Sequence, residues 1–272
     1  MLKKYTKDSL DEYTKNNKFI IYGTGIIAKI FYNHLKKNKV TNNILAFASS
    51  GSYKSSYYMN KPLLSIDELK EYNDILICIA SQERVNTIIQ NELEKRELYN
   101  YVWIRPYLES MVFGPIIQKD EMVDVESLIR QYNDYRFALR WLAVENYYNN
   151  NNIGYNLYIR SREICSSHDS AMSRLGRYVE LIKDFEKKNP EKFPNIRLCR
   201  DLKIIDGCHR VVLAKYLNVN KLRADIHEFN YDRSVWDGVD DYCTKEYLSY
   251  IGFNNYELSE LDRVYHMLRY EK

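Results

Sequence analysis

Leu202-Lys203-Ile204-Ile205-Asp206-Gly207-Cys208-His209-Arg210-Val211-Val212-Leu213-Ala214-Lys215-Tyr216 is the stretch that decides the fold of the second half of the chain. An apolar strand leads into Asp-Gly, and a helix with apolar spacing follows the polar Cys-His-Arg triplet. Gly207 permits a sharp turn and lets a ligand approach the backbone closely. The amides of the triplet are expected at a helix N-terminus, which favours an anion, and Arg210 adds a planar guanidinium suited to phosphate. The pattern predicts a phosphate site.

The Asp-Gly-Cys-His-Arg motif at 206–210, with Ala214 four residues on, resembles the phosphate-binding motif of the ParB/sulfiredoxin superfamily. That superfamily includes chromosome-partition CTPases, sulfiredoxins and free-serine kinases. The resemblance covers about residues 155–230. It implies an α+β domain that binds a nucleotide through Gly207, Cys208, His209 and Arg210. The alternative is a plain strand-to-helix turn with a surface arginine.

Free-serine kinases carry Asp-Gly-His-His-Arg at this place, so the chain keeps four of the five residues and has Cys208 for the first His. The resemblance implies that Asp206 accepts the proton of a substrate hydroxyl or holds Mg²⁺, with His209 as a second catalytic candidate. ATP or ADP is the expected nucleotide, and other nucleotides stay open. The alternative for Asp206 is a turn or N-cap residue.

Sulfiredoxins carry Gly-Gly-Cys-His-Arg, and their reactive cysteine falls at the position of Cys208. A helix N-terminus and a neighbouring arginine favour a thiolate there. Asp206 stands where that family has its first Gly, and a carboxylate opposes a thiolate. We therefore expect Cys208 to be a small residue packed under the helix.

The resemblance also implies a basic residue on the helix before the core hairpin, facing the phosphates. Arg174 and Arg177 lie one turn apart in that region, and Arg160 and Arg162 are further candidates. The alternative for each is a solvated surface arginine.

The first third of the chain alternates strand and helix signals. Continuous apolar runs predict buried strands at 18–22, 44–48, 74–80 and 101–104, and apolar spacing predicts helices at 26–38 and 83–97. This order predicts a Rossmann-like parallel sheet.

Gly23-Thr24-Gly25-Ile26-Ile27-Ala28 fits G-x-G-x-x-A between a strand and a helix, which makes Gly23 and Gly25 candidate ligand-binding residues. The second strand ends Phe-Ala-Ser-Ser at 47–50, without the acidic residue that holds ribose hydroxyls in dinucleotide sites. With the phrase Lys-Pro-Leu-Leu-Ser-Ile-Asp-Glu-Leu at 61–69, the domain resembles Rossmann-like modules attached to bacterial surface-sugar biosynthesis enzymes. That resemblance implies a nucleotide or sugar-nucleotide ligand, or a structural or oligomerising module.

The two halves are joined by a helical pattern over residues 123–148. Ser173 is expected to cap a helix with Leu175 and Tyr178 on one face. The expected organisation is α/β: a Rossmann-like parallel-sheet domain over 1–118, a helical connection over 119–152 and a ParB/sulfiredoxin-like α+β nucleotide-binding domain over 153–272.

The composition of the 272 residues is that of a soluble globular protein, with 45% hydrophobic and 28% charged residues. A net charge of +3 argues against a nucleic-acid partner. The sequence shows no signal-peptide pattern or long uncharged apolar run, so we expect a cytoplasmic protein without membrane insertion. The five histidines have no metal-binding spacing. Reduced thiols are expected for the five cysteines, Cys78, Cys165, Cys199, Cys208 and Cys243.

These patterns predict a nucleotide-dependent phosphotransferase that acts on a small hydroxylated acceptor, in surface-polysaccharide or related sugar metabolism. One alternative is a non-catalytic nucleotide-binding regulatory module. Another is an NAD(P)- or sugar-nucleotide-linked enzyme that uses Gly23 and Gly25. The acceptor, the nucleotide and the oligomeric state, including a homo-oligomer, stay open.

Overall fold

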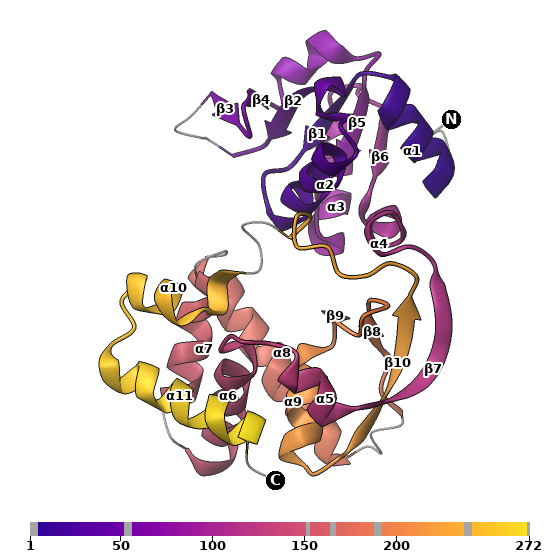
Figure 1. The fold of residues 1–272 in the computed structure, drawn as a ribbon. Coiled ribbons are helices and arrows are strands. Elements are labelled where there is room, and N and C mark those ends of the chain that lie inside the picture. The colour runs from indigo at the N-terminus through magenta and orange to yellow at the C-terminus, as the bar shows by residue number, and fades with distance from the viewer. Residues whose placement is uncertain are drawn as a thin grey trace. The chain divides into compact units, whose positions relative to one another are not determined.

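The structure of the protein is a computed structural model. It describes residues 5–51, 56–150, 153–163, 167–187, 192–236 and 241–270. The chain divides into two compact units (Figure 1). Unit 1 contains Met1–Gly114 and Asp232–Val239, and unit 2 contains Pro115–Tyr231 and Asp240–Lys272.

Unit 1 is built on a mostly parallel sheet of six strands in the order β3-β4-β2-β1-β5-β6. The central strands β1 (Phe19–Tyr22) and β5 (Leu76–Ile79) are apolar and buried along their whole length, as strands covered on both faces require. β1 pairs in parallel with β2 (Ile44–Ser49) on one side and with β5 on the other. The expected mixed α/β fold with a mostly parallel sheet is confirmed.

The remaining elements of unit 1 flank this centre. The outer strands are β3 (Tyr57–Tyr58), which is antiparallel to its neighbour, β4 (Lys61–Ser65) and β6 (Tyr101–Trp103). The helices are α1 (Lys7–Asn16), α2 (Ile26–Lys37), α3 (Glu83–Glu94) and α4 (Arg105–Phe113), with short 3-10 helices η1 (Thr41–Asn43) and η2 (Glu68–Tyr72).

A segment from much later in the sequence completes unit 1. The amide Nδ2 of Asn33 on α2 donates to the carbonyl oxygen of Val235 at 3.0 Å. The Val235 side chain is only 2% exposed. The ring of Trp236 stacks on Phe113 with 5.8 Å between centroids. Because these pairs are more than 100 residues apart in sequence, no local pattern predicts them.

Unit 2 contains a mixed sheet of four strands in the order β7-β10-β8-β9. β7 (Ile116–Asp124) runs antiparallel to β10 (Lys221–His227), which is parallel to β8 (Ile196–Leu198), and β8 is antiparallel to β9 (Ile204–Asp206). A turn in which the Leu202 amide donates to the Cys199 carbonyl oxygen at 2.9 Å joins β8 to β9.

Helices supply most of the unit 2 core, and α6 and α7 cross very closely. A Cβ atom at Gly154 of α7 would lie 1.9 Å from the carbonyl oxygen of Leu142 on α6, so only glycine fits at this crossing. Within the described ranges, no helix of either unit is long and apolar enough to cross a membrane. The elements are α5 (Val125–Arg130), α6 (Arg136–Asn149), α7 (Ile153–Glu163), α8 (His168–Lys187), α9 (Cys208–Tyr216), η4 (Asp241–Cys243), α10 (Lys245–Tyr250) and α11 (Asn255–Tyr270).

The structure differs from the sequence expectation where unit 2 begins. β7 occupies residues 116–124, so the boundary expected at 118 falls inside a strand and the segment from 119 is not wholly helical. The partner of β7 is β10, about 100 residues further on, and single-sequence periodicity cannot reveal it. Asp124 ends the strand and caps α5 by accepting a hydrogen bond from the Ser127 amide at 2.7 Å. The expected cap Ser173 lies inside α8, which begins at His168.

Candidate anion-binding site

Gly207 forms the turn between β9 and α9. Its φ of +116° favours glycine, and an added Cβ would lie 2.4 Å from Cγ2 of Ile196. Gly207 is also the N-cap of α9, and no side chain caps the helix there. The amides of the first turn therefore point to a position where the helix dipole favours an anion.

Arg210 has its guanidinium turned toward the protein. Nη1 donates to the carbonyl oxygens of Pro194 and Asn195, the latter at 2.9 Å, and Nη2 donates to Asp206 Oδ2 at 3.0 Å. The side chain is only 12% exposed. Burial lowers the pKa of Arg210, and the Asp206 charge opposes that shift. Arg210 therefore acts as a positioning residue that fixes Asp206 and the segment before β8.

Asp206, at the end of β9, keeps one carboxylate oxygen open. Its side chain is 54% exposed, and Arg197 Nη2 and Arg210 Nη2 both contact Oδ2, at 3.4 and 3.0 Å. Oδ1 is thus left for a proton or a cation. Mg²⁺ typically takes one or two carboxylates together with phosphate oxygens and water, and Asp206 fits that demand. In the part of the chain that the structure describes, no group of three or more His, Cys, Asp or Glu side chains could hold a metal ion by itself.

His209 packs between two tyrosines. Its ring lies 4.3 Å from that of Tyr178, and its Nε2 is 2.8 Å from the hydroxyl oxygen of Tyr158. Burial, and then nearby positive charge, hold the pKa of His209 well below its usual range, so its imidazole is neutral at pH 7. The charges that act on it belong to Arg140, Arg162, Arg210 and Arg174. A neutral, packed imidazole suits a positioning role better than acid catalysis.

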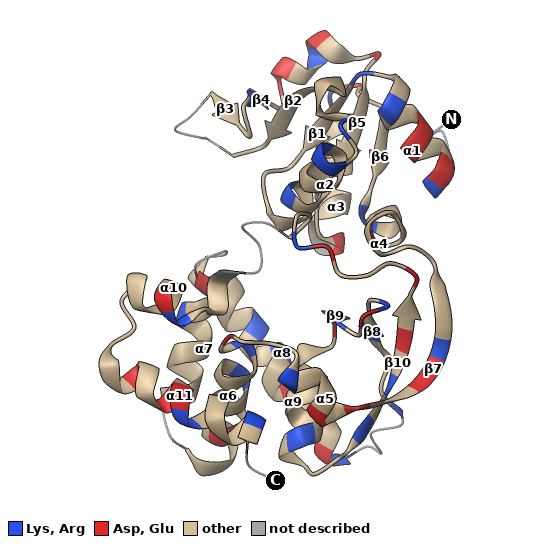
Figure 2. Ribbon diagram, viewed as in Figure 1, with Lys and Arg blue, Asp and Glu red and all other residues tan. Residues whose placement is uncertain are grey.

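Three arginines from successive helices act electrostatically on this histidine and are called the arginine cluster: Arg140 of α6, Arg162 of α7 and Arg174 of α8. Figure 2 marks the Lys and Arg positions along the ribbon in blue. Arg140 is buried, with 8% of its surface exposed. The guanidinium of Arg162 lies 5.1 Å from the centroid of the Tyr158 ring. Burial, followed by the positive charges of Arg140 and Arg174, lowers the pKa of Arg162. Positive charge is therefore concentrated beside the first turn of α9.

The sequence pointed to two members of the arginine cluster and missed the third. Arg162 and Arg174 were candidates, whereas Arg140 stands among the apolar residues of α6 and matches no motif. A charged residue within a buried helical stretch is the signal that could have found it, because an arginine is rarely buried without a partner. Arg177 is exposed and donates to Ser173 Oγ at 3.1 Å, so the structure does not bring it into the cluster.

Arg160 and Cys208 have packing roles in unit 2. Arg160 pairs with Glu257 at 2.5 Å, and its guanidinium lies 4.4 Å from the centroid of the Phe253 ring. Cys208 is the first residue of α9, is a half-buried free thiol and packs against the hydrophobic core. Cys165 lies outside the described residues.

The glycine loop of unit 1 contacts two other segments of the same unit. Gly23 has φ +125°, and a Cβ there would lie 2.7 Å from the carbonyl oxygen of Ala80. The N-cap of α2 is Gly25, which has no atom within 4 Å of an added Cβ. The Tyr58 hydroxyl donates to the carbonyl oxygen of Thr24 at 2.9 Å. Hairpin β3-β4 thus contributes a side chain to the loop where a dinucleotide would be expected.

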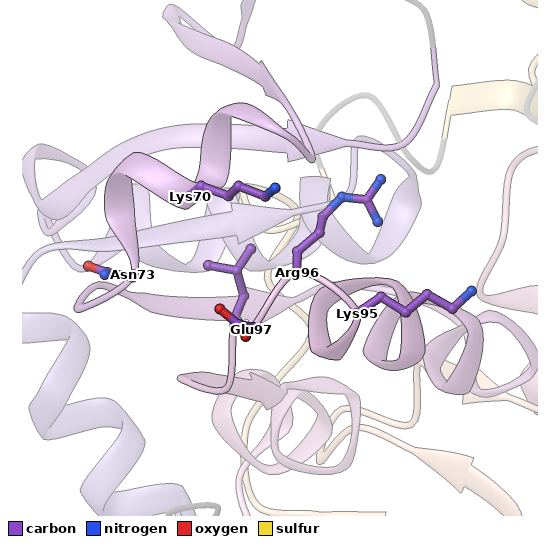
Figure 3. Close-up of a pocket in the computed structure, with 6 residues that line it drawn as sticks. Lys70, Asn73, Lys95, Arg96 and Glu97 are labelled. Atoms are coloured by element: carbon purple, nitrogen blue, oxygen red, sulfur yellow. The ribbon is translucent and has the colours of Figure 1, made fainter.

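A polar pocket of about 380 Å³ lies at the other end of the unit 1 strands (Figure 3). Its basic side chains are already engaged in part: Lys95 pairs with Glu92 at 2.6 Å and Arg96 pairs with Asp67 at 2.7 Å. These pairs reduce its attraction for an anion relative to the arginine cluster. The lining residues are Lys70, Asn73, Lys95, Arg96, Glu97 and Leu98.

No family model, no curated protein and no solved structure matches this chain. The chemistry of the α9 turn therefore has to be argued from its own geometry.

Proposed function

We propose that the protein is a nucleotide-dependent phosphotransferase whose phosphate site is the first turn of α9. The observation that carries the proposal is the uncapped N-terminus of α9, after Gly207, with the arginine cluster beside it. Backbone amides and guanidinium groups together form the usual environment for a nucleotide phosphate chain. The likeness of residues 206–210 to the ParB/sulfiredoxin motif supports the same reading and suggests that superfamily for unit 2.

In this proposal the amides of Cys208, His209 and Arg210 bind the phosphates, and Arg174 supplies charge. An acceptor hydroxyl oxygen attacks the terminal phosphorus of the nucleotide. A new oxygen–phosphorus bond forms while the bond from that phosphorus to the bridging oxygen breaks, and the nucleoside diphosphate leaves with the electron pair. The acceptor proton passes to Oδ1 of Asp206.

In the alternative role of Asp206, Oδ1 would instead hold Mg²⁺ together with the nucleotide phosphates, and the ion would neutralise charge on the transferring group. Arg210 and Arg197 hold the other oxygen of this carboxylate and so fix its direction. A neutral His209 orients the turn through its contact with Tyr158. The acceptor proposed is a small hydroxylated molecule of surface-polysaccharide or sugar metabolism.

Calorimetric titration with ATP and ADP, with and without Mg²⁺, tests the phosphate site. Arg174→Gln should weaken nucleotide binding about tenfold, because it removes one charge-assisted contact worth about 1.5–3 kcal/mol. Arg177→Gln, three residues further along α8, is the matched control and should leave the affinity unchanged. Equal nucleotide affinity in wild type and Arg174→Gln would count against this site.

A non-catalytic nucleotide-binding module is the second candidate. The packing of His209 and the hydrogen bond from Arg210 to a backbone carbonyl favour this candidate, because both side chains are already engaged within the protein. Asp206 is then the motif side chain that remains for catalysis. Asp206→Asn separates the two functions. If the protein is a phosphotransferase, this variant should keep nucleotide binding and lose transfer to an acceptor, whereas a binding module has no transfer to lose.

A further inference from the structure

We propose that Arg140, which is buried, and Arg162, which is half-buried, form a second oxyanion subsite in unit 2. The subsite lies beside the α9 turn and takes an acidic group of the acceptor. The inference rests on the proposed phosphotransferase function, because it names the class of acceptor: a hydroxylated molecule that also carries a phosphate or a carboxylate.

Arg140 is a buried cation on α6. Nη1 donates to the carbonyl oxygen of Arg136, and Nε has no hydrogen-bond partner among the described residues. Among the residues that the structure describes, no carboxylate pairs with Arg140. The groups that act on it electrostatically are thiols and phenols, those of Cys208, Tyr158, Cys243 and Tyr178. Burial of an uncompensated charge is costly, and a bound oxyanion would supply both the missing charge and an acceptor for Nε.

Arg162 places a second guanidinium in the same group of side chains. It lies over the ring of Tyr158, whose hydroxyl contacts His209. The positive charge of Arg140 acts on Arg162, so the two cations repel each other. Tyr178 connects Arg140 to α9, because its hydroxyl donates to the Arg140 carbonyl oxygen at 3.3 Å and its ring contacts His209. Both arginines also act electrostatically on His209 in the first turn of α9.

This arrangement selects for an acidic acceptor. Planar guanidinium groups bind phosphate and carboxylate through parallel N–H donors, and two of them next to each other favour an anion over a neutral polyol. An acceptor anchored by its acidic group would present its hydroxyl near the phosphates on α9. A neutral sugar would bring no negative charge to Arg140.

Calorimetric titration of the full chain with inorganic phosphate tests the subsite. Arg140→Met and Arg162→Gln should each weaken phosphate binding at least tenfold, while the control Arg177→Gln should stay within twofold of wild type. In phosphate-free buffer Arg140→Met should melt no lower than wild type, because it removes an uncompensated buried charge. If Arg140 had a purely structural role, Arg140→Met would instead have a lower melting temperature than wild type both with and without phosphate.

Phosphate affinity within twofold of wild type in both variants would overturn the subsite. If Arg140→Met does not fold, Arg162→Gln decides by the same criterion. Titration with acetate distinguishes carboxylate from phosphate as the preferred group.

The acceptor class is tested by transfer from ATP to glycerol, glycerate and glycerol 3-phosphate, and only the last two should react. If nucleotides fail to bind while phosphate affinity still depends on Arg140, the phosphotransferase proposal falls and the oxyanion subsite stands.

Discussion

The glycine turn of unit 1 and the glycine turn of unit 2 share one local design and differ in what surrounds them. Each follows a strand, precedes a helix without a side-chain cap and has a glycine with positive φ. In both, a Cβ atom would collide with the protein itself, at Ala80 for Gly23 and at Ile196 for Gly207. Packing alone thus explains both glycines.

The surroundings of the two turns decide which is the better ligand site. In unit 1, the Tyr58 hydroxyl is bonded to the loop carbonyl of Thr24, and β2 ends at Ser49 without an acid for a ribose. In unit 2, arginines from three helices act on the first turn of α9. The difference teaches that a glycine turn makes room for a phosphate, whereas the affinity of the turn for phosphate depends on charges from distant elements.

The largest effect is expected from filling the turn of unit 2. Gly207→Ala adds a left-handed alanine, which costs about 1–2 kcal/mol, and an overlap with Ile196, which costs about 1–3 kcal/mol. We expect the free energy of unfolding to fall by about 3 kcal/mol in urea denaturation.

Gly25→Ser is the matched change in unit 1. Its backbone is extended, an added Cβ meets nothing within 4 Å, and serine is a favoured N-cap, so stability should change by less than about 0.5 kcal/mol. Equal losses for Gly207→Ala and Gly25→Ser would contradict the comparison.

Lowering the pH should reduce the free energy of unfolding of unit 2 through His209. Its folded-state pKa lies well below the usual 6.5, so the unfolded chain takes up a proton that the folded chain refuses. This contribution to stability is complete above pH 6.5. It is lost as the pH falls below 6.5, at up to about 1.4 kcal/mol per pH unit, until the folded-state pKa is reached. Thermal melts between pH 7.5 and 5 check the slope, which His209→Gln should flatten.

His34 provides the comparison in unit 1. Burial lowers the pKa of His34 as well, but by less, so His34→Gln should change the pH slope in the same direction and to a smaller extent. A larger change of the pH slope for His34→Gln than for His209→Gln would contradict the expectation that His209 has the more strongly lowered pKa.

A smaller effect than that of Gly207→Ala is expected from Tyr58→Phe, which deletes the hydrogen bond to Thr24 and keeps the ring contact with Phe47. A loss of about 1 kcal/mol in urea denaturation is expected, with no change in ATP affinity. A dinucleotide that binds wild type and is lost in Gly25→Asp would restore the ligand role of the unit 1 loop.

Local sequence patterns predicted the parts of this fold that depend on local chemistry. The continuous apolar strands at 19–22 and 76–79 and the turn at Gly207 could be placed because burial and backbone freedom are visible in neighbouring residues. β7 could not, since its pairing with β10 spans about 100 residues. Arg140 was missed for a related reason: its importance comes from α7, α8 and α9, not from its neighbours on α6.

The return of residues 232–236 to unit 1 has a consequence for synthesis. The Trp236 ring stacks on Phe113, and the Val235 carbonyl oxygen accepts from the Asn33 amide, yet 117 residues lie between Gly114 and Asp232. At about 5–20 residues per second, a ribosome needs roughly 6–23 s to add them. During that interval the Phe113 ring of the nascent unit 1 lacks its Trp236 partner. The contacts of unit 1 with residues 232–236 therefore form only after the β-strands of unit 2 have been synthesised.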